Sequence, residues 1–172
     1  MSKKDNIYVD LARKAIEEYA NKGRRYEPEE PLPPELNKKA GAFVSIKKKG
    51  NLRGCIGTIK ATRENLAREI IANAISAANR DPRFPAVSPE EIPELDISVD
   101  ILGRPEKIDS VNELDPEKYG VIVEKGPRRG LLLPGLEGID TVDKQLDIAY
   151  KKAGISPGEN VQLYRFKVKR YK

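Results

Sequence analysis

The 172-residue sequence contains no histidine and a single cysteine. A zinc site built from cysteine and histidine ligands therefore cannot form within one chain, and neither can an intrachain disulfide. The absence of imidazole also excludes the Ser-His-Asp and Cys-His catalytic arrangements. Any catalysis must use carboxylates, lysine, tyrosine, the one thiol or a borrowed cofactor. From the sequence we predict neither a metal site nor a bound cofactor.

The sequence also has no long apolar run. Its most apolar stretch, residues 70–78, is too short and too interrupted to cross a bilayer. The first residues, Met-Ser-Lys-Lys, lead into a mixed charged segment and not into an apolar signal core. We therefore expect a cytoplasmic protein that does not associate with membranes. The length fits one domain or two closely packed lobes.

Charge is distributed unevenly along the chain. The 32 Lys and Arg residues exceed the 27 Asp and Glu residues by five. Residues 44–63 hold six basic residues and no acid, and residues 160–172 hold five basic residues and no acid. Residues 86–118 carry ten acids against three basic residues. The first basic segment favours an anionic ligand, unless the fold brings the acidic segment alongside it and cancels its field.

Hydrophobic periodicity predicts helices and strands that are interspersed, without a βαβ rhythm. The expected helices run from a cap at Asp5 or Asn6 to about residue 21, from a cap at Thr62 to about residue 79, and from Thr141 to Gly154. Expected strands cover residues 43–47, 52–59, 95–101, 119–124, 130–133 and 161–171. The predicted fold class is α+β, with a mixed, largely antiparallel sheet and flanking helices.

Two shorter segments have recognisable local signatures. Residues 27–34, Glu-Pro-Glu-Glu-Pro-Leu-Pro-Pro, are too rich in proline for a helix. They are expected to form either a stiff, extended segment that lies along the protein surface or a proline-rich ligand for a partner domain. Residues 88–91, Ser-Pro-Glu-Glu, have the pattern of a capping box with proline at the first helical position, which predicts a short helical turn.

The segment Arg53-Gly-Cys-Ile-Gly57 is the strongest candidate for chemistry. Two glycines inside a strand imply a bulge, a sharp bend or another group close to the backbone. Cys55 lies between them, and Arg53 is two positions away on the same strand. We also expect the helix after Thr62 to direct its positive end toward this region. Cys55 is then either a nucleophilic thiolate or a small buried hydrophobic residue.

Two further segments could bind a ligand. Asp81-Pro-Arg83 follows a predicted helix, where Arg83 is either an anion clamp or part of an ordinary helix stop. Residues 163–172 alternate aromatic or apolar residues with basic ones, as in a strand that binds nucleic acid. The same alternation is typical of an amphipathic strand whose apolar face belongs to the core, and this interpretation makes nucleic acid an unlikely partner.

Three runs together resemble the AMMECR-type domain family: Leu52-Arg-Gly-Cys-Ile-Gly57, Asp81-Pro-Arg-Phe84 and Gly130-Leu-Leu-Leu-Pro134. Residues 135–140 are similar to the prokaryotic branch called AmmeMemoRadiSam system protein A. The resemblance covers nearly the whole chain. It implies one AMMECR-type domain over residues 1–172, made of two unequal lobes with a cleft that the 53–57 segment faces.

The resemblance implies no particular reaction. It points to Memo-like and radical-SAM proteins as partners, and to the family motif as the suspected site. The candidate catalytic residue is Cys55, and the candidate residues for binding a small anionic ligand are Arg53, Gly54, Gly57, Asp81 and Arg83. Three functions remain open: a small enzyme or substrate-binding component, a nucleic-acid-binding module, and a non-catalytic interaction protein.

Overall fold

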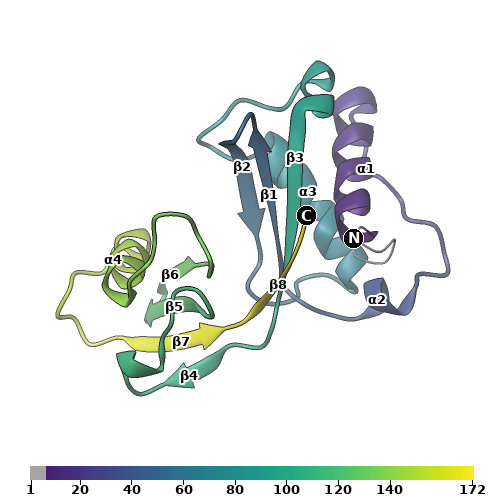
Figure 1. Cartoon of the computed structure of the whole chain (residues 1–172). Helices are drawn as coiled ribbons and strands as arrows, with labels where there is room; N and C mark the ends of the chain where they lie inside the picture. Colours follow the sequence, from purple (N-terminus) through teal and green to yellow (C-terminus); the bar gives the residue numbers. More distant parts are fainter. Residues whose placement is uncertain (1–6) are drawn as a thin grey trace. The chain divides into compact units, whose positions relative to one another are not determined.

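The computed structural model describes residues 7–172 (Figure 1). They divide into two compact units. Unit 1 contains the chain up to Leu102 together with Lys169–Lys172, and unit 2 contains Gly103–Val168. Each unit has its own sheet and its own helix packing.

Unit 1 is built on a four-stranded sheet with the order β2-β1-β3-β8. The strands are β1 (Ala42–Lys48), β2 (Asn51–Gly57), β3 (Leu95–Leu102) and β8 (Val168–Tyr171). β1 pairs antiparallel with both β2 and β3. The β1–β2 hairpin turns at Lys49 and Gly50, where both residues have positive φ, as a tight two-residue turn requires.

Helices cover one face of this sheet. α3 (Leu66–Asn79) packs on β1 and β2, while α1 (Ile7–Lys22) packs on α3 and β3, and the short α2 (Pro34–Asn37) contacts α3. The inward residues of the strands alternate with outward ones, and Val44, Ile46 and Val99 are fully buried against the helices. The other sheet face carries the polar positions of β1, β2 and β3. Residues 27–33 of the proline-rich segment have no regular structure, whereas Pro34, expected to be non-helical, begins α2; Leu32 packs on the core.

Unit 2 is smaller and also consists of a four-stranded sheet with a helix packed on it. Its sheet has the order β4-β7-β5-β6, formed by β4 (Glu106–Ile108), β7 (Gln162–Phe166), β5 (Gly120–Lys125) and β6 (Arg128–Leu132). α4 (Val142–Ala153) packs on β5 and β6. The Thr141 side chain caps its first turn, and Gly154 ends it in the left-handed conformation.

The α+β fold class is confirmed, with two sheets and flanking helices. The capping box at Ser88 is also present and opens the 3-10 helix η1 (Pro89–Glu94). Gly23 has positive φ directly after α1, as expected of a helix terminator. The predicted cap at Asp5 or Asn6 lies outside the described residues.

Two predictions of element boundaries were wrong. The cap of α3 is Asn65, whose side chain accepts a hydrogen bond from the backbone of Arg68. Thr62 instead donates its backbone N–H and its hydroxyl to the buried carboxylate of Glu69. The single strand expected over residues 161–171 is two strands, β7 and β8, which belong to different sheets and are separated at Lys167. Sequence periodicity also failed to indicate α2, β4 and the 3-10 helix η2 (Val111–Glu113).

Candidate functional site

Gly54 lies where the edge strand β2 meets α3. A β-carbon on Gly54 would overlap the backbone carbonyl of Ala77 in α3. The register beside it is irregular: Gly54 pairs with Ile46 and Leu52 pairs with Lys47, so Arg53 has no residue opposite it. This is a β-bulge, which bends the strand and re-aims a side chain. Both features expected of a glycine here, a bulge and a close backbone approach, are confirmed.

Gly57 has a different close neighbour. It pairs with Phe43 across the hairpin, and a β-carbon on Gly57 would overlap the Phe43 ring. The aromatic ring therefore covers the glycine, a packing seen where an aromatic side chain compensates for a strand glycine. This contact gives Gly57 a structural role that needs no ligand.

Cys55 points to the sheet face that the helices do not cover. Its partner across the hairpin is Ser45, and the Ser45 Oγ lies 3.3 Å from the Cys55 Sγ. The thiol forms no disulfide, and Cys55 is partly exposed. The backbone N–H of Cys55 donates to the Asp81 Oδ2 at 3.0 Å. Cys55 is thus neither in the core nor fully in solvent.

Asp81 joins Cys55 to Arg83. It is 4% exposed, and its carboxylate accepts hydrogen bonds from the backbones of Cys55 and Arg83 and from the Arg83 Nε and Nη2. The hydrogen bonds from the Arg83 guanidinium, followed by those from the two backbone N–H groups, hold the pKa of Asp81 well below its usual range. Asp81 is therefore a charged, fully engaged carboxylate.

Arg83 is fixed at one side and open at the other. Its Nε and Nη2 lie 3.0 and 2.8 Å from the two Asp81 oxygens. Its side chain is nevertheless 55% exposed, and among residues 7–172 its Nη1 has no hydrogen-bond partner. Hydrogen bonding to Asp81 raises the pKa of Arg83, and the charges of Asp81 and Cys55 add to this rise. Arg83 is a pre-oriented donor beside Cys55.

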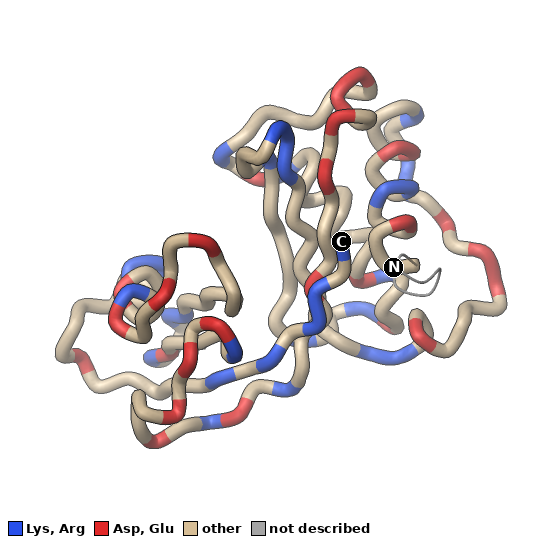
Figure 2. Tube along the Cα trace, viewed as in Figure 1, with Lys and Arg blue, Asp and Glu red and all other residues tan. Residues whose placement is uncertain are grey.

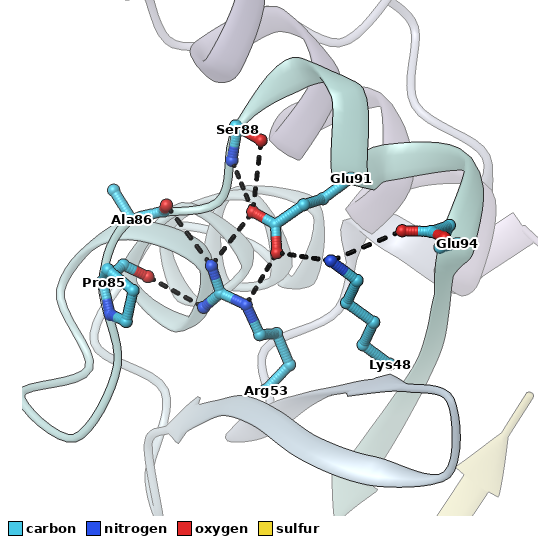
Figure 3. Close-up of polar contacts among 7 residues, drawn as sticks. All are labelled: Lys48, Arg53, Pro85, Ala86, Ser88, Glu91 and Glu94. Atoms are coloured by element: carbon cyan, nitrogen blue, oxygen red, sulfur yellow. Dashed lines mark hydrogen bonds and ion pairs between the residues drawn. The ribbon is translucent and has the colours of Figure 1, made fainter.

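Arg53 lies in a cluster of polar contacts with Lys48, Glu91 and the loop that precedes η1 (Figure 3). Its Nε and Nη2 donate to the two Glu91 oxygens at 3.0 and 3.1 Å, and its Nη1 and Nη2 donate to the carbonyls of Pro85 and Ala86. Lys48 also contacts Glu91, with 3.1 Å between Nζ and Oε1. Only 12% of the Arg53 side chain is exposed. The protein itself therefore uses the donors that the sequence pattern had assigned to a ligand.

Acids pair with two of the six basic residues of the 44–63 segment, Lys48 and Arg53. Figure 2 shows the basic tip of the β1–β2 hairpin and the acidic residues of η1 and the start of β3. Glu91 and Glu94 of η1 pair with Lys48, and Glu91 also pairs with Arg53. These acids come from the acidic 86–118 segment of the sequence. An anion at this face would be bound by directed donors rather than by net charge.

One charged pair on the same sheet was not predicted from the sequence. Asp100 of β3 is 3% exposed, and the Arg170 Nε and Nη2 of β8 lie 2.7 and 2.8 Å from its two oxygens. Hydrogen bonding to Asp100 raises the pKa of Arg170, and the charge of Cys55 contributes to that rise. In the alternating sequence of residues 95–101, Asp100 falls among the polar positions, which are typical of a solvent-exposed strand face. Only the pairing of β8 with β3 shows that an arginine covers it.

The orientation expected for the helix near Cys55 was wrong. Gly54 contacts Ala77, in the last turn of α3, and the first turn of α3 lies toward Thr58 and Thr62 through Glu69. The end of α3 nearest Gly54 is therefore its C-terminal end, which carries the negative end of the helix dipole. The dipole does not stabilise a Cys55 thiolate, and the nearby arginines supply the positive charge.

Within residues 7–172, no group of three or more Cys, Asp or Glu side chains is arranged to hold a metal ion. No helix in that same range has both the length and the apolar character that a membrane crossing requires.

Stability is expected to fall in acid because of Glu91. Hydrogen bonds from Arg53 and from the Ser88 backbone lower the pKa of Glu91 from 4.5 to about 2. Since the folded state holds the lower pKa, the contribution of Glu91 is complete above about pH 5 and is lost as the pH falls toward 2. Urea denaturation should show a loss of about 2 kcal/mol from this residue over that interval, after allowance for solvent screening. Glu91→Gln should flatten the pH dependence by the same amount, and an unchanged slope would contradict the assignment.

The fold and this segment define an α+β protein with a glycine-flanked cysteine on the polar face of its larger sheet. The AMMECR1 family model matches residues 9–171, and the chain belongs to that family. A Thermotoga maritima protein is 56% identical over 171 residues, which cover 98% of each chain. The uncharacterised protein PH0010 from Pyrococcus horikoshii has a crystal structure with a TM-score of 0.90 and 35% identity, and the match covers 99% of this chain and 91% of PH0010.

A longer relative occurs in Clostridium acetobutylicum. The protein CA_C1420 is 48% identical over 167 residues, which are 96% of this chain but 36% of that protein. The chain therefore spans about a third of the Clostridium polypeptide. An AMMECR1 segment can thus be part of a larger protein.

Proposed function

We propose that the sheet face around Cys55 binds a small anionic ligand, with Arg83 as the charged contact. The observation that carries this proposal is the geometry of Arg83. Asp81 holds two of its nitrogens, and the exposed Nη1 remains available as a donor. A guanidinium held in this way binds carboxylate or phosphate with little loss of side-chain freedom.

The backbone of Cys55 lies beside the Arg83 guanidinium, and we place the Cys55 thiol at the same ligand. The Asp81 Oδ2 accepts from the Cys55 backbone at 3.0 Å and from the Arg83 Nη2 at 2.8 Å, so both donors surround one oxygen atom. The Ser45 hydroxyl beside the thiol adds a further hydrogen-bonding group. A hydroxyl is not a base at neutral pH, so these contacts support binding by Cys55 rather than nucleophilic catalysis.

Alkylation of Cys55 by a charged and a neutral reagent tests this proposal. Iodoacetate carries a carboxylate and iodoacetamide does not, and the same thiolate attacks both reagents and displaces iodide. The ratio of their rates therefore reports the preference for an anion and cancels the thiolate fraction. Arg83→Gln should lower the ratio of iodoacetate to iodoacetamide rates about threefold, the effect of one nearby charge in a well-solvated site.

Arg129→Gln is the matched control for this measurement. Arg129 is an exposed arginine of unit 2 that pairs with Glu124, so its removal should leave the rate ratio unchanged. A ratio that is the same in wild type and in Arg83→Gln would contradict anion binding by Arg83.

We also propose that this binding serves partner proteins of the Memo-like and radical-SAM classes in the cytoplasm, as in the AmmeMemoRadiSam branch. The long Clostridium relative supports a role beside other protein segments. Co-purification of the chain with each class of partner, compared with Arg83→Gln, tests the proposal. Absence of a complex with either partner would contradict it.

The C-terminal strands offer little support for nucleic-acid binding. Phe166 is 1% exposed, and its ring lies against Gly120. The Tyr171 ring lies 4.5 Å from that of Tyr8. Bases stack only on exposed aromatic faces, so two of the three aromatic residues in this segment are already occupied. We therefore do not propose this function.

A further inference from the structure

We propose that Arg53 is a positioning residue of the anion site: it does not contact the ligand, but holds the 81–88 loop on the edge of β2 so that Arg83 is presented beside Cys55. This inference rests on the proposed binding of an anion by Arg83. Arg53 is the arginine of the 53–57 segment, and in this proposal it positions Arg83 and does not bind the ligand.

The Arg53 guanidinium is already hydrogen-bonded to other groups of the protein. Four hydrogen bonds of 2.8 to 3.3 Å reach Glu91 and the carbonyls of Pro85 and Ala86 (Figure 3). The bulge at Arg53 explains its direction, because the extra residue turns the side chain toward the loop. A ligand would have to displace these hydrogen bonds to reach Arg53.

The same contacts also restrict the position of Arg83. The loop is attached to β2 at two places, through Asp81 at the Cys55 backbone and through Pro85 and Ala86 at Arg53. Only residues 82–84 lie between these attachments. Two backbone bonds brace the loop, from Phe84 to Asp81 and from Val87 to Ala78. With both ends held, Arg83 has few alternative positions.

Glu91 connects η1 to the place where Arg53 attaches the 81–88 loop to β2. Its Oε2 accepts from the Ser88 backbone at 2.8 Å, as a capping box requires, and from the Arg53 Nη2 at 3.1 Å. One carboxylate therefore closes the first turn of η1 and holds the arginine of β2. The loop is tied to a helix start as well as to a strand.

A ligand contact and a positioning residue respond oppositely to two substitutions. If Arg53 bound the anion by its charge, Glu91→Gln would release that charge and strengthen anion binding, and Arg53→Lys would preserve it. If Arg53 positions the loop, Glu91→Gln weakens anion binding, because it weakens the two hydrogen bonds that join the Arg53 guanidinium to residue 91. Arg53→Lys weakens binding too, since an ammonium cannot make the forked contacts to Glu91 and the two carbonyls.

The experiment measures the ratio of iodoacetate to iodoacetamide rates at Cys55 in wild type, Arg53→Lys, Glu91→Gln and the control Arg129→Gln. We expect the ratio to fall about two- to threefold in both Arg53→Lys and Glu91→Gln and to stay at the wild-type value in the control. A higher ratio in Glu91→Gln, or a wild-type ratio in Arg53→Lys, would overturn the positioning role.

Amide hydrogen exchange at Val87 gives an independent readout. The Val87 N–H donates to the Ala78 carbonyl at 2.9 Å, and Val87 is buried, so its exchange reports opening of the loop. We expect about tenfold faster exchange at Val87 in Arg53→Lys, with no change at the core strand residue Val99. Unchanged Val87 exchange would overturn the inference even if alkylation changed.

The two readouts separate this inference from the proposed function. If wild type and Arg83→Gln alkylate with the same ratio, the anion site fails, and faster Val87 exchange alone still shows that Arg53 holds the loop. If Glu91→Gln does not fold, Arg53→Lys, which keeps the charge of residue 53, decides the question. A Val99 amide that also exchanges faster would assign the effect to global unfolding and count against a local positioning role.

Discussion

Gly54→Ala is expected to lower the free energy of unfolding by about 3 kcal/mol or more. The new β-carbon would overlap the Ala77 carbonyl, a backbone group inside a helix that is itself packed on the sheet. A flexible side chain could move away, but this carbonyl can move only if α3 shifts. For a chain of this size the melting temperature should fall by about 6–12 °C.

Gly50→Ala is the matched control on the same hairpin. Gly50 has a φ of +80°, and apart from its chain neighbours no residue of the described range 7–172 has an atom within 4 Å of the position that a β-carbon would take, so alanine there suffers only the backbone cost of about 1 kcal/mol. Thermal and urea denaturation of both variants separate close packing from backbone conformation. Equal, small losses in the two variants would contradict the packing of Gly54 against α3.

Asp81→Asn should cost about 3 kcal/mol of stability and should also abolish the anion preference at Cys55. Each Asp81 oxygen accepts two hydrogen bonds, and the donors are the Cys55 backbone and three nitrogens of Arg83. In Asp81→Asn, an amide NH₂ group replaces one of the oxygens that accept these hydrogen bonds. Two N–H donors of Cys55 or Arg83 would then face another N–H donor and lose their acceptor. Because Asp81 is 4% exposed, water cannot easily replace the lost acceptor.

Asp96→Asn is the control for this substitution. Asp96 belongs to β3 of the same unit but is exposed, so its change should alter stability by no more than about 0.5 kcal/mol. Urea denaturation gives the stability of each variant, and the two alkylating reagents give its anion preference. A stable Asp81→Asn protein with a wild-type rate ratio would show that Asp81 does not orient Arg83.

Local rules predicted the glycine contacts and most element ends. A glycine inside a strand carries an entropy cost, so a close neighbour could be expected at Gly54 and Gly57 without knowledge of which group it is. Gly23, Gly154 and the Ser88 capping box likewise acted through adjacent residues. The two helix-ending glycines and the capping box are visible in the sequence because the residues they act on lie within a few positions of them.

The rest depended on partners distant in the chain. Arg53 meets Glu91 and two carbonyls that are 32 to 38 residues away, so its role could not be predicted from its neighbours. Thr62 and Asn65 are both good helix caps, and the buried Glu69 decides between them by binding Thr62. The alternating pattern of residues 163–172 continues through Lys167 and hides the change of sheet there.

The central claim is that Arg83, and not Arg53, is the arginine that binds an anion beside Cys55. The most direct test is a titration of the protein with inorganic phosphate at constant ionic strength, with arginine side-chain resonances followed by nitrogen-15 NMR. The Arg83 resonances should shift saturably, and the Arg53 resonances, held by Glu91, should stay in place. A saturable shift of Arg53 with no response from Arg83 would contradict the account.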